Sequence, residues 1–356
     1  MKLKLGDVCE KGSSSLKQSD ILGKPGDYPI YGASGYIGNV DFYHQEKPYV
    51  AIVKDGAGIG RTTFHPAKSS VIGTMQYLLP KDNVLPKYLY YVVGHMHLEK
   101  YSSGATIPHI YFKDYKMEEF NYDSFDKQNN IVAILGRCEK VISARKRELE
   151  LLDSLIKARF VEMFGDCSNM VLLNDLCLII TDGTHQPPKF QEKGIPFILV
   201  SNLSNNTVTY NTEKYISEET YNELYKRTPI EPGDLLLSTV GSYGHPAVVT
   251  EDIRFLFQRH IAYLRPKREL VNSFYLHSAL LAPDGQRQIE EKVKGIAQKT
   301  LNLSEIRKIM IPLPKMEEQD KFAAFVHQVD KSKVVVQKAL DEAQILFDSL
   351  MQKYFG

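Results

Sequence analysis

Residues 322–354, FAAFVHQVDKSKVVVQKALDEAQILFDSLMQKY, place apolar side chains at alternating steps of four and three, interrupted at Lys333. Residues 131–163, IVAILGRCEKVISARKRELELLDSLIKARFVEM, carry the same spacing, interrupted at Arg145 and Arg159. Apolar residues at this spacing form the seam of a coiled coil. Both stretches therefore predict long helices, each roughly 55 Å long at about 1.5 Å per residue.

The two apolar stripes share one register, because each position of the first stripe lies 191 residues before its counterpart in the second. A stripe this narrow is too thin for an ordinary core helix, so we expect the two helices to pack on each other. If the two stretches were unrelated surface helices, their shared register would be accidental. The predicted seam residues are Ile131, Leu135, Ile142, Leu149, Leu152 and Ile156 in the first helix, and Phe322, Val326, Val329, Val336, Leu340, Phe347 and Leu350 in the second.

The helices belong to an internal repeat that covers the chain. LGDVC at residues 5–9 recurs as LNDLC at 173–177, and YLLPK at 77–81 recurs as YLRPK at 263–267, in the same order. From Gly104 onward the register is constant, up to and through the two helices. A repeat of this length indicates a duplicated architecture.

The segments before each helix contain short apolar or β-branched runs separated by Gly, Pro and Asn, with a few helical pieces. This composition is typical of mixed α+β domains of ordinary size. We therefore expect a globular domain at residues 1–121, a long helix at 122–165, a second globular domain at 166–314 and a second long helix at 315–356.

Charge and cysteine content limit the classes of function. Lys and Arg number 44 against 43 Asp and Glu, a formal charge of +1, so nucleic-acid affinity would require local cationic patches. The four cysteines show no CxxC pair and no His partner at ligand spacing, which predicts a reduced protein without a zinc site. No apolar stretch approaches the roughly 18–20 residues of a membrane span, and the start lacks a signal peptide's apolar core. We expect a cytoplasmic protein.

A glycine-rich stretch at residues 49–61, YVAIVKDGAGIGR, has the composition of a cofactor loop. Such a loop needs a helix after its glycines, so that the helix N-terminus faces a phosphate or carboxylate. Here Thr62, Thr63 and Pro66 follow, which predict a second strand. We interpret the stretch as a tight strand turn.

No catalytic motif stands out. The sequence HQPPK at residues 185–189 lacks the leading Asn or Asp and the aromatic residue that a DNA amino-methyltransferase would need. The carboxylates and lysine of a metal-dependent nuclease occur in PDGQRQIEEK at 283–292, but that stretch predicts a helix and not two neighbouring strands. Ser201 and Ser238 lack the context of an activated nucleophile. We expect no catalytic residue and no metal site.

Cationic and polar residues suited to DNA gather in turns of both globular domains. Arg and Gln can bind purine edges, whereas Lys, Ser and Thr bind phosphates. Each such residue by itself is most simply a solvated side chain, and it is the whole set that favours DNA. The candidate DNA-binding residues are Lys54, Arg61, Thr106, His109, His185, Lys189, Ser242, Tyr243, Arg259, His260 and Lys299, and further cations lie at Lys226, Arg227, Arg254, Arg265, Lys267 and Arg268.

Several motifs resemble those of the specificity subunit of type I restriction–modification systems. The most specific is the join IPLPKMEEQDKFAAFV at residues 311–326. The others are YGASG at 31–35, GATIPHIYFKDY at 104–115, DGTHQPPKF at 182–190, GIAQKTLNL at 295–303 and FDSLMQKYF at 347–355. Together they cover essentially the full chain.

The resemblance implies two target recognition domains, each contacting one half of a bipartite double-stranded DNA site, with the helices packed as an antiparallel coiled coil between them. It implies a non-catalytic subunit that binds no cofactor itself. Two methyltransferase subunits, which bind S-adenosylmethionine, and restriction and translocase subunits would dock on it. Because the two domains differ in sequence, we expect an asymmetric target. The alternatives are a coiled-coil scaffold without a DNA role and a DNA-binding protein without a methyltransferase partner.

Overall fold

The computed structural model describes residues 1–104, 106–295 and 298–356. Ala105, Ile296 and Ala297, which belong to two of the motifs above, lie outside the described residues. The chain divides into two compact units, the first comprising Met1–Lys146 and Lys338–Gly356 and the second Arg147–Gln337.

The first unit is built on a four-stranded antiparallel sheet with the order β2-β8-β5-β6. Its central strand β5 is buried on both faces, which explains its continuous apolar sequence YVAIV. The helix α2 (Pro86–His95) covers one face, and a small sheet of order β4-β3-β7 covers the other. The strands are β2 (Cys9–Ser13), β3 (Tyr28–Gly32), β4 (Gly35–Val40), β5 (Tyr49–Val53), β6 (Thr62–His65), β7 (Ser70–Val71) and β8 (Met75–Pro80).

The second unit repeats this plan. Its main sheet has the order β11-β17-β14-β15, its small sheet the order β13-β12-β16, and α7 (Ser273–Leu281) takes the place of α2. Both small sheets contain one parallel pair, β3 with β7 and β12 with β16. The strands are β11 (Cys177–Asp182), β12 (Ile195–Ile198), β13 (Tyr215–Ile216), β14 (Leu235–Ser238), β15 (Pro246–Val248), β16 (Leu256–Phe257) and β17 (Ile261–Pro266).

Strand register defines equivalent residues in the two units. Val50 lies opposite Leu78 in the first unit, and Leu235 lies opposite Leu264 in the second. The recurring tyrosines of the sequence repeat, Tyr77 and Tyr263, therefore occupy the same position in β8 and β17.

Short elements complete each unit. The strand β1 (Lys2–Lys4) pairs with β9 (Glu119–Asn121), and β10 (Met170–Leu172) pairs with β18 (Met310–Pro312) in the same way. The remaining short helices are α1 (Leu5–Val8), η1 (Gln18–Ile21), η2 (Leu98–Tyr101), α3 (Phe112–Tyr115), α5 (Leu173–Leu176), η3 (Val200–Leu203), α6 (Glu218–Leu224), α8 (Pro283–Lys292) and α9 (Leu303–Ile306).

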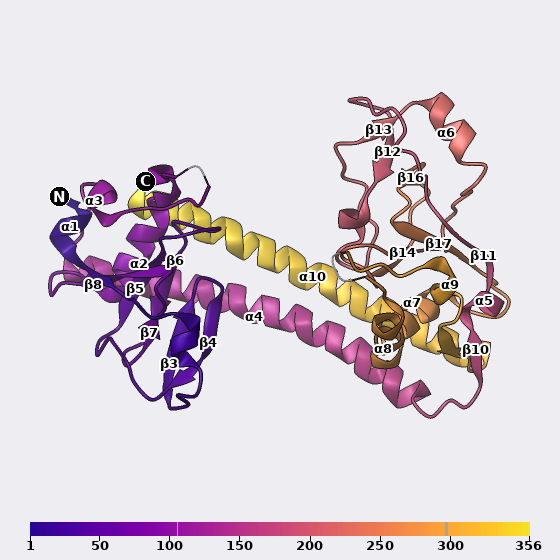
Figure 1. The fold of residues 1–356 in the computed structure, drawn as a ribbon, viewed down its shortest axis with the longest axis horizontal. Helices are drawn as coiled ribbons and strands as arrows, with labels where there is room; N and C mark the ends of the chain where they lie inside the picture. The colour runs from indigo at the N-terminus through magenta and orange to yellow at the C-terminus, as the bar shows by residue number, and fades with distance from the viewer. Residues whose placement is uncertain (105, 296–297) are drawn as a thin grey trace. The chain divides into compact units, whose positions relative to one another are not determined.

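Two helices of 40 residues, α4 (Phe125–Phe164) and α10 (Met316–Phe355), are each about 60 Å long (Figure 1). In the first unit the start of α4 packs in one core with the end of α10. In the second unit the end of α4 packs with the start of α10. The helices are therefore antiparallel within each unit, and the predicted α+β fold with a packed helix pair is confirmed.

The predicted seam residues face inward. Ile131, Leu135, Ile142, Phe322, Val326, Val329, Val336 and Leu340 are buried, whereas Leu149, Leu152, Ile156, Phe347 and Leu350 are half-buried. Where Lys333 interrupts the stripe, its Nζ lies 2.6 Å from Oδ1 of Asp153 on α4. An ion pair thus replaces an apolar contact at that position.

Three buried aromatic residues near the helix ends fall outside the heptad stripe. Phe160 and Phe164 of α4 pack against Tyr275, with ring centroids 5.5 and 5.0 Å away. Phe355 of α10 packs against Tyr88 at 5.5 Å. At their ends the helices bury side chains against the globular part of each unit as well as against each other, and a heptad pattern does not predict that contact.

Two buried glutamines join the long helices to the starts of α2 and α7 in the same manner. Gln128 Oε1 accepts a hydrogen bond from the backbone nitrogen of Leu85 at 2.9 Å. Gln319, its counterpart in the repeat, accepts one from the backbone nitrogen of Asn272, also at 2.9 Å. Within the described residues, no helix is both long enough and apolar enough to cross a membrane.

Candidate nucleic-acid interface

The GAGIG stretch forms a turn between β5 and β6, as predicted, and no helix follows it. Gly56, Gly58 and Gly60 have φ values of 83°, 87° and 81°, which favour glycine. A Cβ on Gly60 would lie 2.6 Å from the backbone nitrogen of Glu99, so this glycine also permits a close approach. The equivalent turn of the second unit ends at Gly244, with φ 80°.

The end of β5 brings two predicted DNA-binding residues together. Lys54 Nζ lies 3.0 Å from Oδ2 of Asp55, and His109 Nδ1 lies 2.7 Å from Oδ1 of the same carboxylate. Burial acts to raise the pKa of Asp55, but hydrogen bonds from His109 and Lys54 outweigh it and hold the pKa below its usual value. Thr106 is exposed in the loop that leads to His109. Asp55, which the sequence did not single out, orients this cluster.

Arg61 does not join that cluster. It lines a separate cavity of about 420 Å³ with residues of α2 and α10, including Tyr90, Tyr91 and Phe347. Lys54 and Arg61 stand on either side of one turn in the sequence, yet they line different cavities.

A second cluster lies beside the glycine turn of the second unit. Lys299 Nζ is 3.0 Å from Oε1 of Glu290 and 3.2 Å from the hydroxyl of Tyr243, which itself donates a hydrogen bond to Glu290. The hydrogen bonds from Tyr243 and Lys299 lower the pKa of Glu290. Ser242 is exposed next to them. Residues 283–292 form the helix α8, as the sequence predicted. Glu290 lies on this helix, and its carboxylate holds Lys299 in place.

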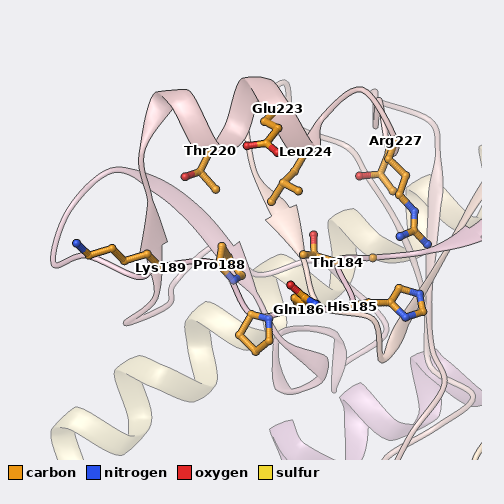
Figure 2. A pocket seen from close by; sticks show the side chains of 12 residues that line it. Thr184, His185, Gln186, Pro188, Lys189, Thr220, Glu223, Leu224 and Arg227 are labelled. Carbon is orange, nitrogen blue, oxygen red and sulfur yellow. The ribbon is translucent and has the colours of Figure 1, made fainter.

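A third cluster surrounds a cavity of about 400 Å³ between the loop at residues 183–189 and α6. Asp182 accepts contacts from both His185 Nε2, at 2.9 Å, and Arg227 Nη2, at 2.6 Å. In Figure 2, Thr184 and Gln186 lie across the cavity from Glu223 and Leu224 of α6, and the Lys189 side chain extends away from them.

Arg259 and His260 adjoin this third cluster. The backbone nitrogen of Arg259 donates to the carbonyl oxygen of Thr184 at 3.1 Å, and its Nε lies 3.3 Å from Nε2 of His260. Burial lowers the pKa of His260, and the neighbouring Arg259 lowers it further. At neutral pH the cation at this position is therefore Arg259.

Three other arginines of the second unit lie close to carboxylates. Arg265 Nη2 lies 3.0 Å from Oδ2 of the buried Asp234, and Arg268 lies 3.6 Å from Oδ1. Arg254 donates to both carboxylate oxygens of Glu218, at 2.8 and 2.6 Å. Arg265 is thereby held against a buried carboxylate, whereas Arg254 and Arg268 remain more than half exposed. Within the described ranges, no three His, Cys, Asp or Glu side chains are grouped so that they could hold a metal ion.

Comparison with known proteins places this fold in a family. Residues 1–152 and 168–343 match the family described as "Type I restriction modification DNA specificity domain". The chain belongs to this family. Among curated specificity proteins, the type I restriction enzyme EcoBI specificity subunit of Escherichia coli is 31% identical over 177 residues, which are 49% of this chain and 37% of that subunit. The MjaIX specificity subunit of Methanocaldococcus jannaschii is 22% identical over 304 residues, 78% of this chain and 69% of that protein.

Solved structures of the specificity family have the same fold. The type I restriction–modification S subunit from M. genitalium has a TM-score of 0.60 at 16% identity and covers 100% of this chain and 96% of its own. A chain from a study of complex assembly and conformational transition in the type I system has a TM-score of 0.53, also at 16% identity, and covers 99% of this chain and 97% of its own. The resemblance found in the sequence motifs is thus confirmed for the family and for the fold.

Proposed function

We propose that this chain is the non-catalytic DNA-specificity subunit of a type I restriction–modification enzyme. It contacts a bipartite site in double-stranded DNA, one half with each target recognition domain. The observation that carries the proposal is that one specificity-domain fold occurs twice in the chain, with different side chains at equivalent surface positions.

The loops at equivalent strand ends support an asymmetric target. Lys54 and Asp55 follow β5, whereas the uncharged Thr239 and Val240 follow β14. His109 bridges to Asp55 in one unit, and Thr300 bridges to Val240 in the other. Since base edges are distinguished by the donors and acceptors that face them, loops with different donors select different sequences.

In this proposal, residues 1–121 and 166–314 are the recognition domains, and the helices at residues 122–165 and 315–356 set the length of the DNA between the half-sites. A repeated DNA-binding module on a rigid connection contacts half-sites at a fixed separation. The buried Gln128 and Gln319, which hold each long helix to the start of α2 or α7, support such a connection.

Two methyltransferase subunits dock on the chain and supply S-adenosylmethionine chemistry, and restriction and translocase subunits join for cleavage. The chain itself binds no cofactor and acts in the cytoplasm. Its formal charge of +1 favours a complex in which the methyltransferase subunits supply many of the phosphate contacts.

The test is co-expression with its methyltransferase partner, followed by sequencing that detects methylated adenine across the genome. The expected result is one bipartite motif with two different halves and a constant spacer. Exchange of residues 1–121 for those of a relative should change one half of the motif and leave the other intact. A palindromic motif would contradict asymmetry, and an unchanged motif after the exchange would favour a scaffold without a DNA role.

A further inference from the structure

A cationic cavity of about 380 Å³ lies in the first unit, between the ends of β2 and β5, the start of β8 and the helix α3. Four lysines line it: Lys11, Lys54, Lys113 and Lys116. Lys54 is paired with Asp55, whereas the other three have no ion-pair partner among residues 1–104, 106–295 and 298–356. The volume is in the range of sites that bind small ligands.

A buried amide without a partner lines the same cavity. Gln76 is 2% exposed, and its Nε2 has no hydrogen-bond partner in the described part of the chain. Gln76 lies two residues before Leu78 in β8, so both side chains are on the same face of the sheet, the face that carries the apolar core. On the neighbouring strand, Gln76 stands opposite Ile52. An unpaired amide in such a place costs free energy, which a ligand with an acceptor atom would offset.

The chemistry of the lining points to an anion. Asp55 is the one carboxylate among the lining residues, and His109 and Lys54 already occupy it. The remaining groups donate: three unpaired ammonium groups, the hydroxyl of Ser13 and the amide of Gln76. Tyr111 adds an aromatic ring that is 50% exposed, with Lys113 Nζ 5.6 Å and the stacked ring of His109 6.3 Å from its centroid. A phosphate on a nucleotide, with several acceptor oxygens beside a flat ring, matches this set.

The second unit lacks this site. By strand register and by the sequence repeat, Ala262 stands where Gln76 stands, and Ile180 stands where Lys11 stands. Arg307, the counterpart of Lys116, donates a hydrogen bond to the carbonyl oxygen of Ile180 and so is already engaged. The positions of Lys54 and Lys113 are taken by Thr239 and Ser304. The duplicated fold by itself therefore does not require a cationic cavity, and its presence in one unit needs a cause specific to that unit.

We infer that this cavity binds a backbone phosphate of the DNA half-site contacted by the first recognition domain. The inference rests on the proposed function. Lys113 and Lys116 neutralise the phosphate, the Gln76 amide donates to one of its oxygens, and Tyr111 packs on the adjoining nucleotide. The second domain holds its half-site without an equivalent contact.

The first experiment uses the complex of this chain with its methyltransferase. It measures the affinity of that complex for DNA that carries the motif found by the methylation sequencing. Lys113→Gln with Lys116→Gln should weaken binding about tenfold and reduce the slope of log affinity against log salt by about 0.9, the value for one phosphate. The matched control, Lys47→Gln with Lys68→Gln, removes two exposed lysines of the same unit that lie outside the cavity, and should change affinity less than twofold. An equal loss in the control would reduce the effect to general charge and overturn the inference.

Gln76→Leu separates binding from folding. If the amide serves a ligand, the variant should bind DNA several-fold more weakly while its melting temperature is unchanged or higher, because an unpaired buried donor has been removed. A lower melting temperature with unchanged affinity would assign Gln76 to the fold alone and overturn its role here.

The second experiment replaces single phosphates of the first half-site by neutral methylphosphonates. One replacement should weaken binding of the wild-type complex and have no further effect on the lysine double variant, which is the coupling expected of a direct contact. Specific binding without any such coupled phosphate would overturn the inference and leave the proposed function intact, whereas no sequence-specific binding at all would overturn the proposed function itself. Inorganic phosphate could instead stabilise the wild-type complex against unfolding, but not the lysine double variant, while no methylphosphonate shows the coupling described. That result would assign the cavity to a free phosphorylated ligand and overturn the assignment to DNA.

Discussion

The two units have the same strands in the same order, yet equivalent interior positions hold an aromatic cluster in one unit and a charged network in the other. In the first unit, Tyr49 stacks on His65 with ring centroids 5.2 Å apart and accepts a hydrogen bond from Ser69 at 2.9 Å. In the second unit, Asp234 replaces Tyr49 and binds Arg265 at 3.0 Å. A backbone plan stabilised by strand pairing accepts either an aromatic cluster or a charged network at these positions.

The surfaces diverge in the same way, while the contacts that join α2 and α7 to the long helices and to the strands before them do not. Tyr88 and Tyr275 each donate a hydrogen bond to a backbone carbonyl of the strand before the long helix, at 3.1 and 2.6 Å. Gln128 and Gln319 are buried with matching partners. Divergence is thus concentrated where DNA contacts are proposed and in the interior behind them, and the connection to the helices is kept.

The largest effect is expected in the helix seam, where equivalent leucines differ in burial. Leu340 is 8% exposed and Leu149 is half-buried. Leu340→Asp should lower the free energy of unfolding by about 3–4 kcal/mol, because it places an unpaired charge in an apolar seam. Leu149→Asp should cost about half as much, since water still reaches that side chain. Chemical denaturation of the purified chain measures both.

The control for these variants is Val335→Asp on the same helix, because Val335 is 69% exposed. It should change stability by less than about 0.5 kcal/mol. Unimpaired stability and complex assembly in both seam variants would contradict the packed helix pair, and equal losses would show that burial does not distinguish the two positions.

The next largest loss of stability is expected from substitutions in the charged network of the second unit. Asp234→Ala leaves Arg265 without its buried carboxylate and removes the acceptor of the Tyr263 hydroxyl, 2.9 Å away, so we expect a loss of about 3 kcal/mol. Tyr49→Phe at the equivalent position removes a single hydrogen bond and should cost about 1 kcal/mol.

A double variant sharpens this contrast. Asp234→Leu with Arg265→Leu removes both charges and approaches the apolar character of the first unit, so it should be less destabilised than Asp234→Ala alone. A double variant that is less stable than the single variant would show that the second unit depends on the ion pair itself, and that the two interiors are not interchangeable.

The sequence predicted the features that depend on local spacing. The long helices, the shared register of the seam, the strand that follows GAGIG and the helix at residues 283–292 all follow from periodicity and turn chemistry. It did not predict Asp55 or Asp234 as members of clusters, because their partners are distant along the chain: His109 lies 54 residues from Asp55, and Arg265 lies 31 from Asp234. Nor did it predict Gln76, whose cavity is lined by residues of other elements. Phe160 and Phe164 were missed because they leave the heptad stripe to meet Tyr275. A tertiary contact of this kind has no periodic signature.

The smallest effect at neutral pH, and one that grows on acidification, is expected at His65, whose equivalent in the second unit is Val249. His65 is 4% exposed, and burial lowers its pKa from 6.5 to about 4. As the pH falls below about 6.5 the unfolded chain takes up a proton that the folded chain refuses until about pH 4, so stability is complete above pH 6.5 and is lost between these values. At about 1.4 kcal/mol per pH unit, the loss should reach about 2 kcal/mol at pH 5.

Hydrogen exchange can assign this loss to one unit. After correction for the intrinsic exchange rates, opening free energies of β5 and β6 should fall between pH 7 and pH 5, while those of β14 and β15 should change little from this source. His65→Val copies the residue of the second unit and should remove the pH dependence of β5 and β6, because the imidazole that takes up the proton there is gone. If the variant kept the pH dependence of the wild type in β5 and β6, the proton would bind elsewhere, and His65 would not distinguish the two interiors.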